Sequence, residues 1–350
     1  MADPDRVYDL IVLGCGPGGY AAAYTASMAG IDILVITKTR QGSLHGEKIT
    51  PVQSIHPGVV SLLERLELKK IVDQATRAVF SEIQSGDQVN PLGQNDETWY
   101  GHHLDRVIFD RGLTDTLNAL SIPLTYESVR EVLGGHDEVK VYTDKNSYRA
   151  RYVIDATGYR RKSNSKLHLY NKSYSATMTC WTGRAVFSES STQSLKTSFQ
   201  SLEDGWVWIA PESENTYTWT QLSLQKKKPK EAPLPDSNII GHPDAYNVSW
   251  RLSRPICKDN ILLCGDAAGM IDPASGQGIL KALLSGIKAA RCVRACLHQQ
   301  AMAHYHQVEY DQWFIHQFEQ SVEKLSQYYQ ELGINHSILK NPLTKQAALP

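Results

Sequence analysis

Two glycine-rich stretches, far apart in the chain, constrain its fold more than any other feature. The first, Gly14-Cys15-Gly16-Pro17-Gly18-Gly19, follows an apolar run from Leu10 to Leu13 and precedes the small residues of 20–30. A strand, a glycine turn and a helix in this order form the phosphate-binding motif of Rossmann domains. The N–H groups at the helix start would hold the pyrophosphate of a dinucleotide. The predicted contacts fall on Gly14, Gly16, Pro17, Gly18 and Gly19.

The ribose end of this site departs from the usual pattern. A second apolar strand, Ile33 to Ile36, ends in Thr37 and Lys38, where an acidic residue usually binds the ribose hydroxyls. A threonine hydroxyl can donate or accept a hydrogen bond there. We expect Thr37 and Lys38 to form a weaker ribose site.

The second glycine-rich stretch follows the apolar run 261–264 and begins with Gly265-Asp266. It resembles the FAD-dependent hydroxylase superfamily, which implies that Asp266 binds the ribityl chain and that Pro273 lines the isoalloxazine ring. The helix start after this proline would face the flavin pyrimidine and stabilise negative charge on reduced flavin. The residues assigned to the flavin by this resemblance are Gly265, Asp266, Pro273, Gly276, Gln277, Gly278 and Ile279.

Composition excludes several classes of partner. The chain has 350 residues and a formal net charge of -1, so no bulk field favours nucleic acid or an anionic membrane. No apolar run approaches the about 18 residues that span a bilayer, and the polar start does not resemble a signal peptide. We therefore expect a cytoplasmic protein. The six cysteines lack CxxC spacing, and we expect no metal site.

The order of patterns predicts an α/β fold with a discontinuous cofactor domain. Residues 1–75, 100–171 and 250–300 are assigned to a Rossmann-type FAD-binding domain. Residues 76–99 and 172–249, rich in Thr, Ser, Trp and Tyr with alternating polarity, are assigned to an inserted antiparallel-sheet substrate domain. Residues 301–350 form the predicted C-terminal helical region. Residues 85–97 are expected to be a polar loop.

Further motifs narrow the resemblance to flavin-dependent halogenases and to the related flavoproteins that hydroxylate protein-bound tryptophan. They are Gly46-Glu47-Lys48, His102-His103-Leu104-Asp105-Arg106, Ala156-Thr157-Gly158 and Gly205-Trp206-Val207-Trp208. The resemblance implies that Glu47, Lys48, Arg106, Thr157 and Gly158 contact the cofactor. It also implies that Trp206 and Trp208 close the front of the flavin and exclude water. These two tryptophans could equally be aromatic residues that fill a sheet face.

A missing lysine favours hydroxylation over halogenation. The halogenases use a catalytic lysine in the strand that here spans 77–83, and this segment contains none. The resemblance therefore implies that a flavin C4a-hydroperoxide transfers oxygen to an electron-rich aromatic ring such as indole. Glu47 and His103 are the predicted residues that position or deprotonate the substrate.

The resemblance also suggests the partners. The tryptophan-hydroxylating relatives act in tryptophylquinone biosynthesis, so the expected substrate is a tryptophan in a precursor protein of a quinone-cofactor oxidase or dehydrogenase. No second nucleotide loop is visible, so electrons would come from a separate flavin reductase or from transient NAD(P)H. The alternatives are a flavin-dependent halogenase of indole, phenol or pyrrole, a prenyl reductase of the geranylgeranyl type, and a non-catalytic flavin-binding maturation chaperone.

Overall fold

The structure is a computed structural model that describes residues 2–38, 51–93, 97–161, 169–188, 195–225 and 227–334. The chain divides into two compact units of three segments each. The first unit comprises residues 1–45, 110–174 and 250–324, and the second comprises 46–109, 175–249 and 325–350.

The first unit contains the expected Rossmann-type sheet. The strands of its main path are β19 (Cys257–Lys258), β20 (Ile261–Leu263), β11 (Ser147–Asp155), β1 (Val7–Leu13), β2 (Ile33–Thr37) and β8 (Leu124–Tyr126), in this order. From β20 to β8 all neighbours are parallel, while β9 (Val129–Leu133) and β10 (Val139–Thr143) add an antiparallel hairpin to β11. Residues 10–13 of β1 are apolar and buried because parallel sheets are covered on both faces.

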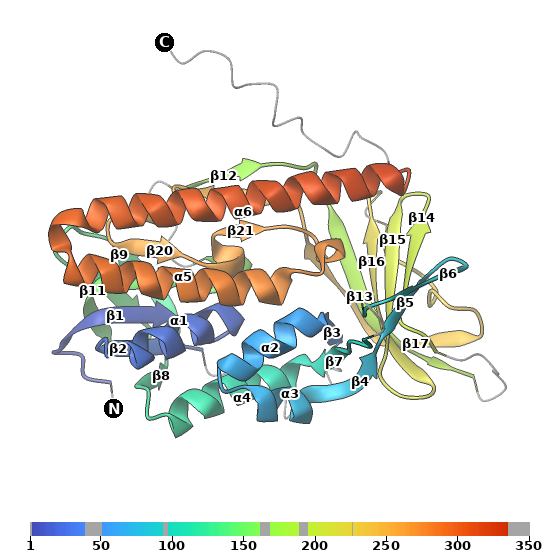
Figure 1. Cartoon of the computed structure of the whole chain (residues 1–350), viewed down its shortest axis with the longest axis horizontal. Coiled ribbons are helices and arrows are strands. Elements are labelled where there is room, and N and C mark those ends of the chain that lie inside the picture. Colours follow the sequence, from blue (N-terminus) through green and yellow to red (C-terminus); the bar gives the residue numbers. More distant parts are fainter. Residues whose placement is uncertain are drawn as a thin grey trace, which may run out of the picture. The chain divides into compact units, whose positions relative to one another are not determined.

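Besides residues 110–119 of a helix that begins in the second unit, the described part of this unit contains three α-helices. They are α1 (Pro17–Met28), α5 (Gly278–His298) and α6 (Ala303–Glu331), whose last residues belong to the second unit. Figure 1 shows α5 beside the first part of α6, and Lys288 of α5 pairs with Glu309 of α6 at 3.2 Å. A small sheet joins β12 (Tyr170–Ser173), β18 (Arg251–Arg254) and β21 (Gly269–Met270).

The second unit is built on a seven-stranded sheet. Its order is β17 (Ser237–Asn247), β13 (Thr179–Phe187), β16 (Thr216–Ser223), β15 (Gly205–Pro211), β14 (Ser198–Leu202), β5 (Glu82–Ser85) and β6 (Gln88–Pro91). All pairs are antiparallel except β14 with β5. Val207 and Ile209 pack on one face with Tyr217 and Trp219. Because side chains alternate along a strand, Trp206 and Trp208 project from the other face.

The sheets of the second unit differ from two predictions, and the first difference concerns a three-stranded sheet. Here β7 (Gly101–Asp105) lies between β3 (Val52–Ile55) and β4 (Thr76–Phe80), next to α2 (Pro57–Arg65) and α3 (Lys69–Ala75). Residues 46–75 and 100–109 therefore group with the second unit rather than with the cofactor domain, while 301–324 group with the first. The segment predicted as a polar loop contains β6, since Gln88–Pro91 pairs with β5.

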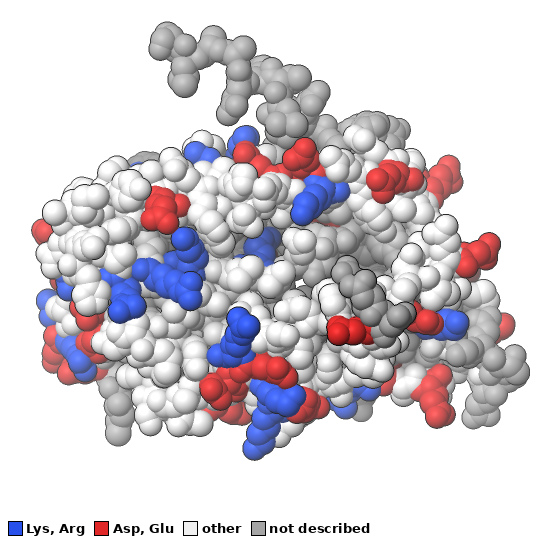
Figure 2. All heavy atoms as spheres, in the orientation of Figure 1, with Lys and Arg blue, Asp and Glu red and all other residues white. Residues whose placement is uncertain are grey.

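Helix α4 (Arg106–Ala119) begins directly after β7. In the described ranges of the chain, no helix combines the length and the apolar character needed to cross a bilayer. Acidic and basic side chains are interspersed over the face drawn in Figure 2, with uncharged areas between them.

Candidate functional site

The first glycine loop forms a tight turn between β1 and α1. Gly14 has φ of +88° and donates its N–H to Ile36 O at 2.8 Å. A Cβ on Gly19 would lie 1.9 Å from Gly14 O, whereas a Cβ on Gly16 would meet nothing within 4 Å. The loop is therefore closed on its protein side and open at Gly16, where α1 begins without a side-chain cap. This is the arrangement that accepts a phosphate.

The turn after β11 lies against this loop. A Cβ on Gly14 would lie 2.8 Å from Ala156 O. The buried Asp155 carboxylate orders the turn, because its Oδ1 accepts hydrogen bonds from the Thr157 N–H at 2.9 Å and the Thr157 hydroxyl at 2.6 Å. Gly158 then adopts a φ of +75°.

The Gly265-Asp266 turn is held from α5. Gly265 has φ of +56°, and its N–H donates to Ser285 Oγ at 2.9 Å. Cys264 N–H donates to Asp155 O at 3.1 Å, which joins the turn to the end of β11. The Asp266 side chain is 45% exposed, so its carboxylate is open to a ligand.

The segment from Pro273 to Gly278 is partly exposed. The buried Asp272 carboxylate accepts from Trp250 Nε1 at 2.5 Å and from Ala274 N–H at 3.0 Å. Gly276 has φ of +62°, and α5 then begins at Gly278 without a side-chain cap. Pro273 and the run 276–278 are exposed, while Ile279 is buried.

These groups fit FAD. Uncapped amides at α1 suit the pyrophosphate, the Asp266 carboxylate suits ribityl hydroxyls, and uncapped amides at α5 suit the electron-rich pyrimidine edge. Thr37 is half-buried and Lys38 is exposed at the end of β2.

Glu127 is an acidic residue beside Thr37, because its N–H donates to Thr37 O at 2.9 Å. Its carboxylate accepts hydrogen bonds from Thr143, Asn146 and Tyr148 and is 5% exposed. Through these hydrogen bonds Glu127 connects the end of β10 to β11.

The two predicted tryptophans lie in the second unit and differ in environment. Trp206 is buried and donates from Nε1 to Tyr329 Oη at 2.7 Å. Trp208 is half-buried and donates from Nε1 to Ser54 Oγ at 3.0 Å. Its indole ring and the Phe80 ring form a T-shaped pair, with the centroids 6.3 Å apart.

His103 lies in the same cluster and is 0% exposed. Its Nδ1 is 2.8 Å from Ser54 Oγ, its Nε2 is 2.8 Å from Thr197 Oγ1, and its ring stacks on Phe80 with centroids 4.5 Å apart. Burial and the neighbouring His102 lower the pKa of His103 to about 3. Neutral His103 is thus connected to the Trp208 indole through Ser54.

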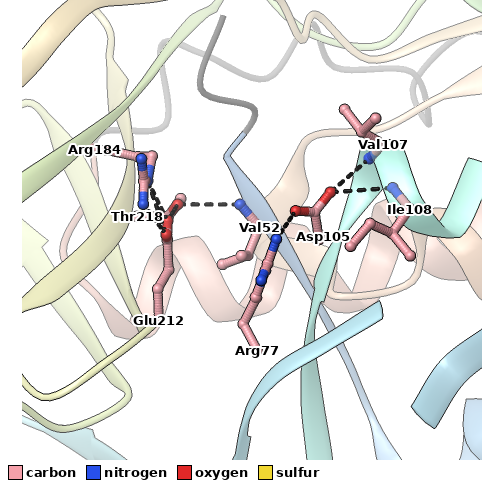
Figure 3. A network of polar contacts seen from close by, with 8 residues as sticks. All are labelled: Val52, Arg77, Asp105, Val107, Ile108, Arg184, Glu212 and Thr218. Atoms are coloured by element: carbon pink, nitrogen blue, oxygen red, sulfur yellow. Dashed lines mark hydrogen bonds and ion pairs between the residues drawn. The ribbon is translucent and has the colours of Figure 1, made fainter. Parts of the chain in front are cut away.

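Figure 3 shows two carboxylates of the second unit that sequence reasoning missed. Glu212 accepts hydrogen bonds from Arg184 Nε at 2.8 Å and from the Thr218 hydroxyl at 2.5 Å, and Val52 N–H donates to Thr218 Oγ1 at 3.1 Å. Glu212 thus contacts Arg184 of β13 and Thr218 of β16, and Thr218 in turn contacts Val52 of β3. The alternation of the strands gives the faces of these residues but not their partners.

The second carboxylate, Asp105, caps α4. Its Oδ1 accepts from Val107 N–H at 2.9 Å and Ile108 N–H at 3.1 Å, and its Oδ2 pairs with Arg77 at 2.6 Å. Burial alone would raise the pKa of Asp105, but these hydrogen bonds and the Arg77 charge lower it below its usual value. Its position directly before a helical pattern was the available sequence signal.

The predicted site residues are distributed over both units. All the flavin residues assigned to the two glycine-rich stretches and to the turn after β11 lie in the first unit. Arg106, where Nη1 donates to Gln53 Oε1, lies in the second unit with His103 and the tryptophans. Glu47 and Lys48 fall outside the described residues.

Comparison with known proteins identifies a family and several similar proteins. The tryptophan halogenase family matches residues 67–332. Among curated proteins, digeranylgeranylglycerophospholipid reductase 1 of Methanococcoides burtonii is 24% identical over 320 residues, which cover 83% of this chain and 76% of that protein.

Solved structures with the same fold include a peptidyl tryptophan dihydroxylase, QhpG, essential for tryptophylquinone cofactor biogenesis. Its TM-score is 0.70 at 19% identity, with 95% of this chain and 76% of that chain covered. The myxobacterial chondrochloren halogenase CndH has a TM-score of 0.77 at 18% identity, with coverages of 93% and 83%. These likenesses confirm the predicted fold class.

Proposed function

Because the chain belongs to the tryptophan halogenase family, we propose that it is a monooxygenase that hydroxylates the indole ring of a tryptophan in a precursor protein. The resemblance predicted from the sequence is confirmed, and the chain is a flavoprotein whose cofactor is FAD. The choice of hydroxylation, of indole and of a protein substrate is our proposal.

The choice of hydroxylation rests on one observation, that the basic residue of β4 is an arginine. Segment 76–85 contains Arg77 and no lysine, and the Arg77 guanidinium pairs with Asp105 at 2.6 Å. An arginine stays protonated at physiological pH and cannot act as a nucleophilic amine. The exposed Lys69, at the start of α3, pairs with Glu64 at 2.9 Å. The relay lysine of halogenases therefore has no counterpart in this strand.

The described residues have separate tasks in this proposal. The starts of α1 and α5 and the Asp266 carboxylate hold FAD, which supplies the activation of O2 when it is reduced. Half-buried Trp208 forms part of the wall of the substrate site and keeps water away from it. His103 acts through Ser54 to fix Trp208, because both of its ring nitrogens are already hydrogen-bonded. On the resemblance alone, we assign proton removal from the ring to Glu47, which lies outside the described residues.

The choice of substrate is supported by two features. QhpG, which is named as a peptidyl tryptophan dihydroxylase, shares the fold over 95% of this chain. The half-buried rings of Trp208 and Phe80 pack edge-on, and we place the substrate indole beside this aromatic pair. A flavin reductase or NAD(P)H would supply the two electrons that convert one oxygen atom of O2 to water.

The test combines the purified chain with FAD, a flavin reductase, NADH and a tryptophan-bearing precursor in labelled oxygen gas. We expect the precursor to gain one or two labelled oxygen atoms at tryptophan. Incorporation of bromine when bromide is added would support a halogenase instead. A precursor that stays unmodified, with FAD reoxidised, would overturn the hydroxylase.

A reductase of prenyl double bonds is the second candidate, favoured by the 24% identity to the archaeal reductase. In that case the reduced enzyme would add hydrogen to a geranylgeranyl lipid without oxygen. Anaerobic incubation with this lipid, followed by its mass, separates the two reactions. The predicted maturation chaperone would leave both substrates unchanged.

A further inference from the structure

Lys281 is a buried cation beside the residues assigned to FAD. It lies in the first turn of α5, and its side chain is 14% exposed. Nζ donates a hydrogen bond to Gly269 O at 2.7 Å and lies 3.8 Å from Asp266 Oδ1. It also lies 6.0 Å from the centroid of the Phe318 ring. All of these residues belong to the first unit.

This position is unfavourable for a lysine in two respects. The N-terminus of a helix carries partial positive charge, so a cation in the first turn is repelled. Burial further penalises the ammonium group and lowers the pKa of Lys281, which the Asp266 carboxylate opposes. Asp266 offsets only part of the cost of burying the Lys281 charge. Its side chain is 45% exposed, and its Oδ1 lies 3.8 Å from Lys281 Nζ.

Two residues of α5 hold the turn between β20 and β21 by different chemistry. Ser285 lies one helical turn after Lys281 and accepts from Gly265 N–H at 2.9 Å. This contact is neutral. Lys281 binds the other end of the turn at Gly269 O and adds a positive charge next to Asp266. An ammonium group has three protons, so both contacts can be made at once.

We propose that Lys281 is a positioning residue for the cofactor, which orients the Asp266 carboxylate toward FAD and adds positive charge that favours reduced FAD over oxidised FAD. Reduced flavin carries more negative charge, so a nearby buried cation stabilises it more. The inference rests on the proposed role of Asp266 and does not depend on the aromatic substrate.

The test measures FAD binding and the midpoint potential of bound FAD, without turnover. In Lys281→Met we expect about tenfold weaker binding of oxidised FAD, the size typical of a lost hydrogen bond to a charged group. The affinity for reduced FAD should fall by about a further factor of ten, which lowers the two-electron midpoint potential of bound FAD by about 30 mV. Lys281→Gln, which can still donate to Gly269 O, should recover much of the oxidised-state affinity but keep the lower potential.

Matched variants separate charge from structure. Lys288→Met removes a cation from the same helix that pairs with Glu309, and we expect wild-type binding and potential. Ser285→Ala should weaken both redox states equally and leave the potential unchanged. Lys281→Arg keeps the positive charge and should retain the wild-type potential. If Lys281→Met does not fold, the potentials of Lys281→Arg and Lys281→Gln are compared instead.

An unchanged potential in Lys281→Met and Lys281→Gln would overturn the inference, even if affinity falls. Wild-type affinity for FAD in Lys281→Met would contradict the proposed role of Lys281 in orienting the Asp266 carboxylate. These failures differ from failure of the proposed function, in which wild-type protein binds FAD with the predicted Lys281 effects but leaves the precursor unmodified. Wild-type protein that binds no FAD would overturn both.

Discussion

Burial decides the protonation state of His103. The side chain is 0% exposed, and Ser54 and Thr197 hydrogen-bond both ring nitrogens. The Trp208 indole can only donate, so Ser54 Oγ accepts from it and can donate its own proton to His103 Nδ1. The imidazole would then donate from Nε2 to Thr197. A charged imidazole carries a proton on Nδ1 and could not accept the hydrogen bond from Ser54.

We predict that His103 makes stability pH-dependent. Its pKa is lowered to about 3 in the folded protein from an ordinary value of 6.5, so between these values the unfolded chain binds the additional proton. Stability from this group is complete above pH 6.5 and falls on acidification, by up to about 1.4 kcal/mol per pH unit. Half-buried His102, with its pKa also lowered, acts in the same direction.

Urea unfolding between pH 7 and 4.5 measures this slope. His103→Gln should reduce the slope, whereas His304→Gln, at an exposed position on α6, should retain it. A slope that His103→Gln leaves intact would show that folding does not lower the pKa of His103.

Ser54→Ala tests the connection from His103 to Trp208. The indole N–H and His103 would each lose a hydrogen bond, which should cost about 1–3 kcal/mol of stability. If Trp208 closes the substrate site, more reducing equivalents should end as hydrogen peroxide instead of product. Ser201→Ala, at an exposed position of β14, is the control. Unchanged peroxide yield with a folded variant would argue against this role of Trp208.

The Arg184–Glu212 pair is a structural contact. The Glu212 side chain is 9% exposed, and the Arg184 side chain is 22% exposed. Arg184→Met leaves a nearly buried carboxylate without its ion pair, and we expect a loss of about 3 kcal/mol in chemical denaturation. Lys69→Met removes one partner of an exposed pair and should have little effect. Equal effects of the two variants would contradict this assignment.

At the scale of elements, the contact between α1 and α5 depends on glycine. A Cβ on Gly286 of α5 would lie 2.1 Å from Gly18 O of α1, closer than any real contact. The start of α1 is also the proposed phosphate site. Helix packing and cofactor binding are therefore coupled through the same backbone.

Gly286→Ala should push α5 away from α1. We expect a large loss of thermal stability and weaker FAD binding, because α1 must shift. The matched change Gly58→Ala in α2 places its Cβ 3.6 Å from His56 Nδ1, an ordinary contact, and should be neutral or slightly stabilising. Wild-type FAD affinity in Gly286→Ala would show that the helices do not need this close approach.

At the scale of the whole molecule, both units are discontinuous in sequence. Each combines three segments, so the first glycine loop and the Gly265-Asp266 turn meet in one unit although most of the chain separates them. The first unit contains most of the proposed flavin residues. A bound cofactor should therefore stabilise an assembly of distant segments.

FAD should raise the stability of the chain by mass action. At a free concentration 100 times its dissociation constant, a ligand that binds only the folded state adds about 2.7 kcal/mol. Thermal unfolding with and without FAD measures this, and AMP in place of FAD tests whether the pyrophosphate and flavin are needed. A melting temperature that FAD does not raise would contradict the assigned cofactor site.

The sequence alone determined the elements whose signals are local. The run 10–13, the loop Gly14–Gly19 and the helix after it needed only neighbouring residues, as did the Gly265-Asp266 turn and the alternation around Trp206 and Trp208. Backbone conformation and strand period depend on near neighbours, so these patterns indicated a Rossmann-type cofactor frame and a separate sheet.

Only the tertiary structure decided which side chains meet. His103 contacts Ser54 because β7 pairs with β3 in one register, and it reaches Thr197 from a segment 94 residues away. The same pairing moved residues 46–75 and 100–109 out of the predicted cofactor domain, and the α5 turn placed Lys281 beside Asp266. Shifting a strand by one residue reverses its faces, so burial, pKa and partners depend on long-range register that no local pattern contains.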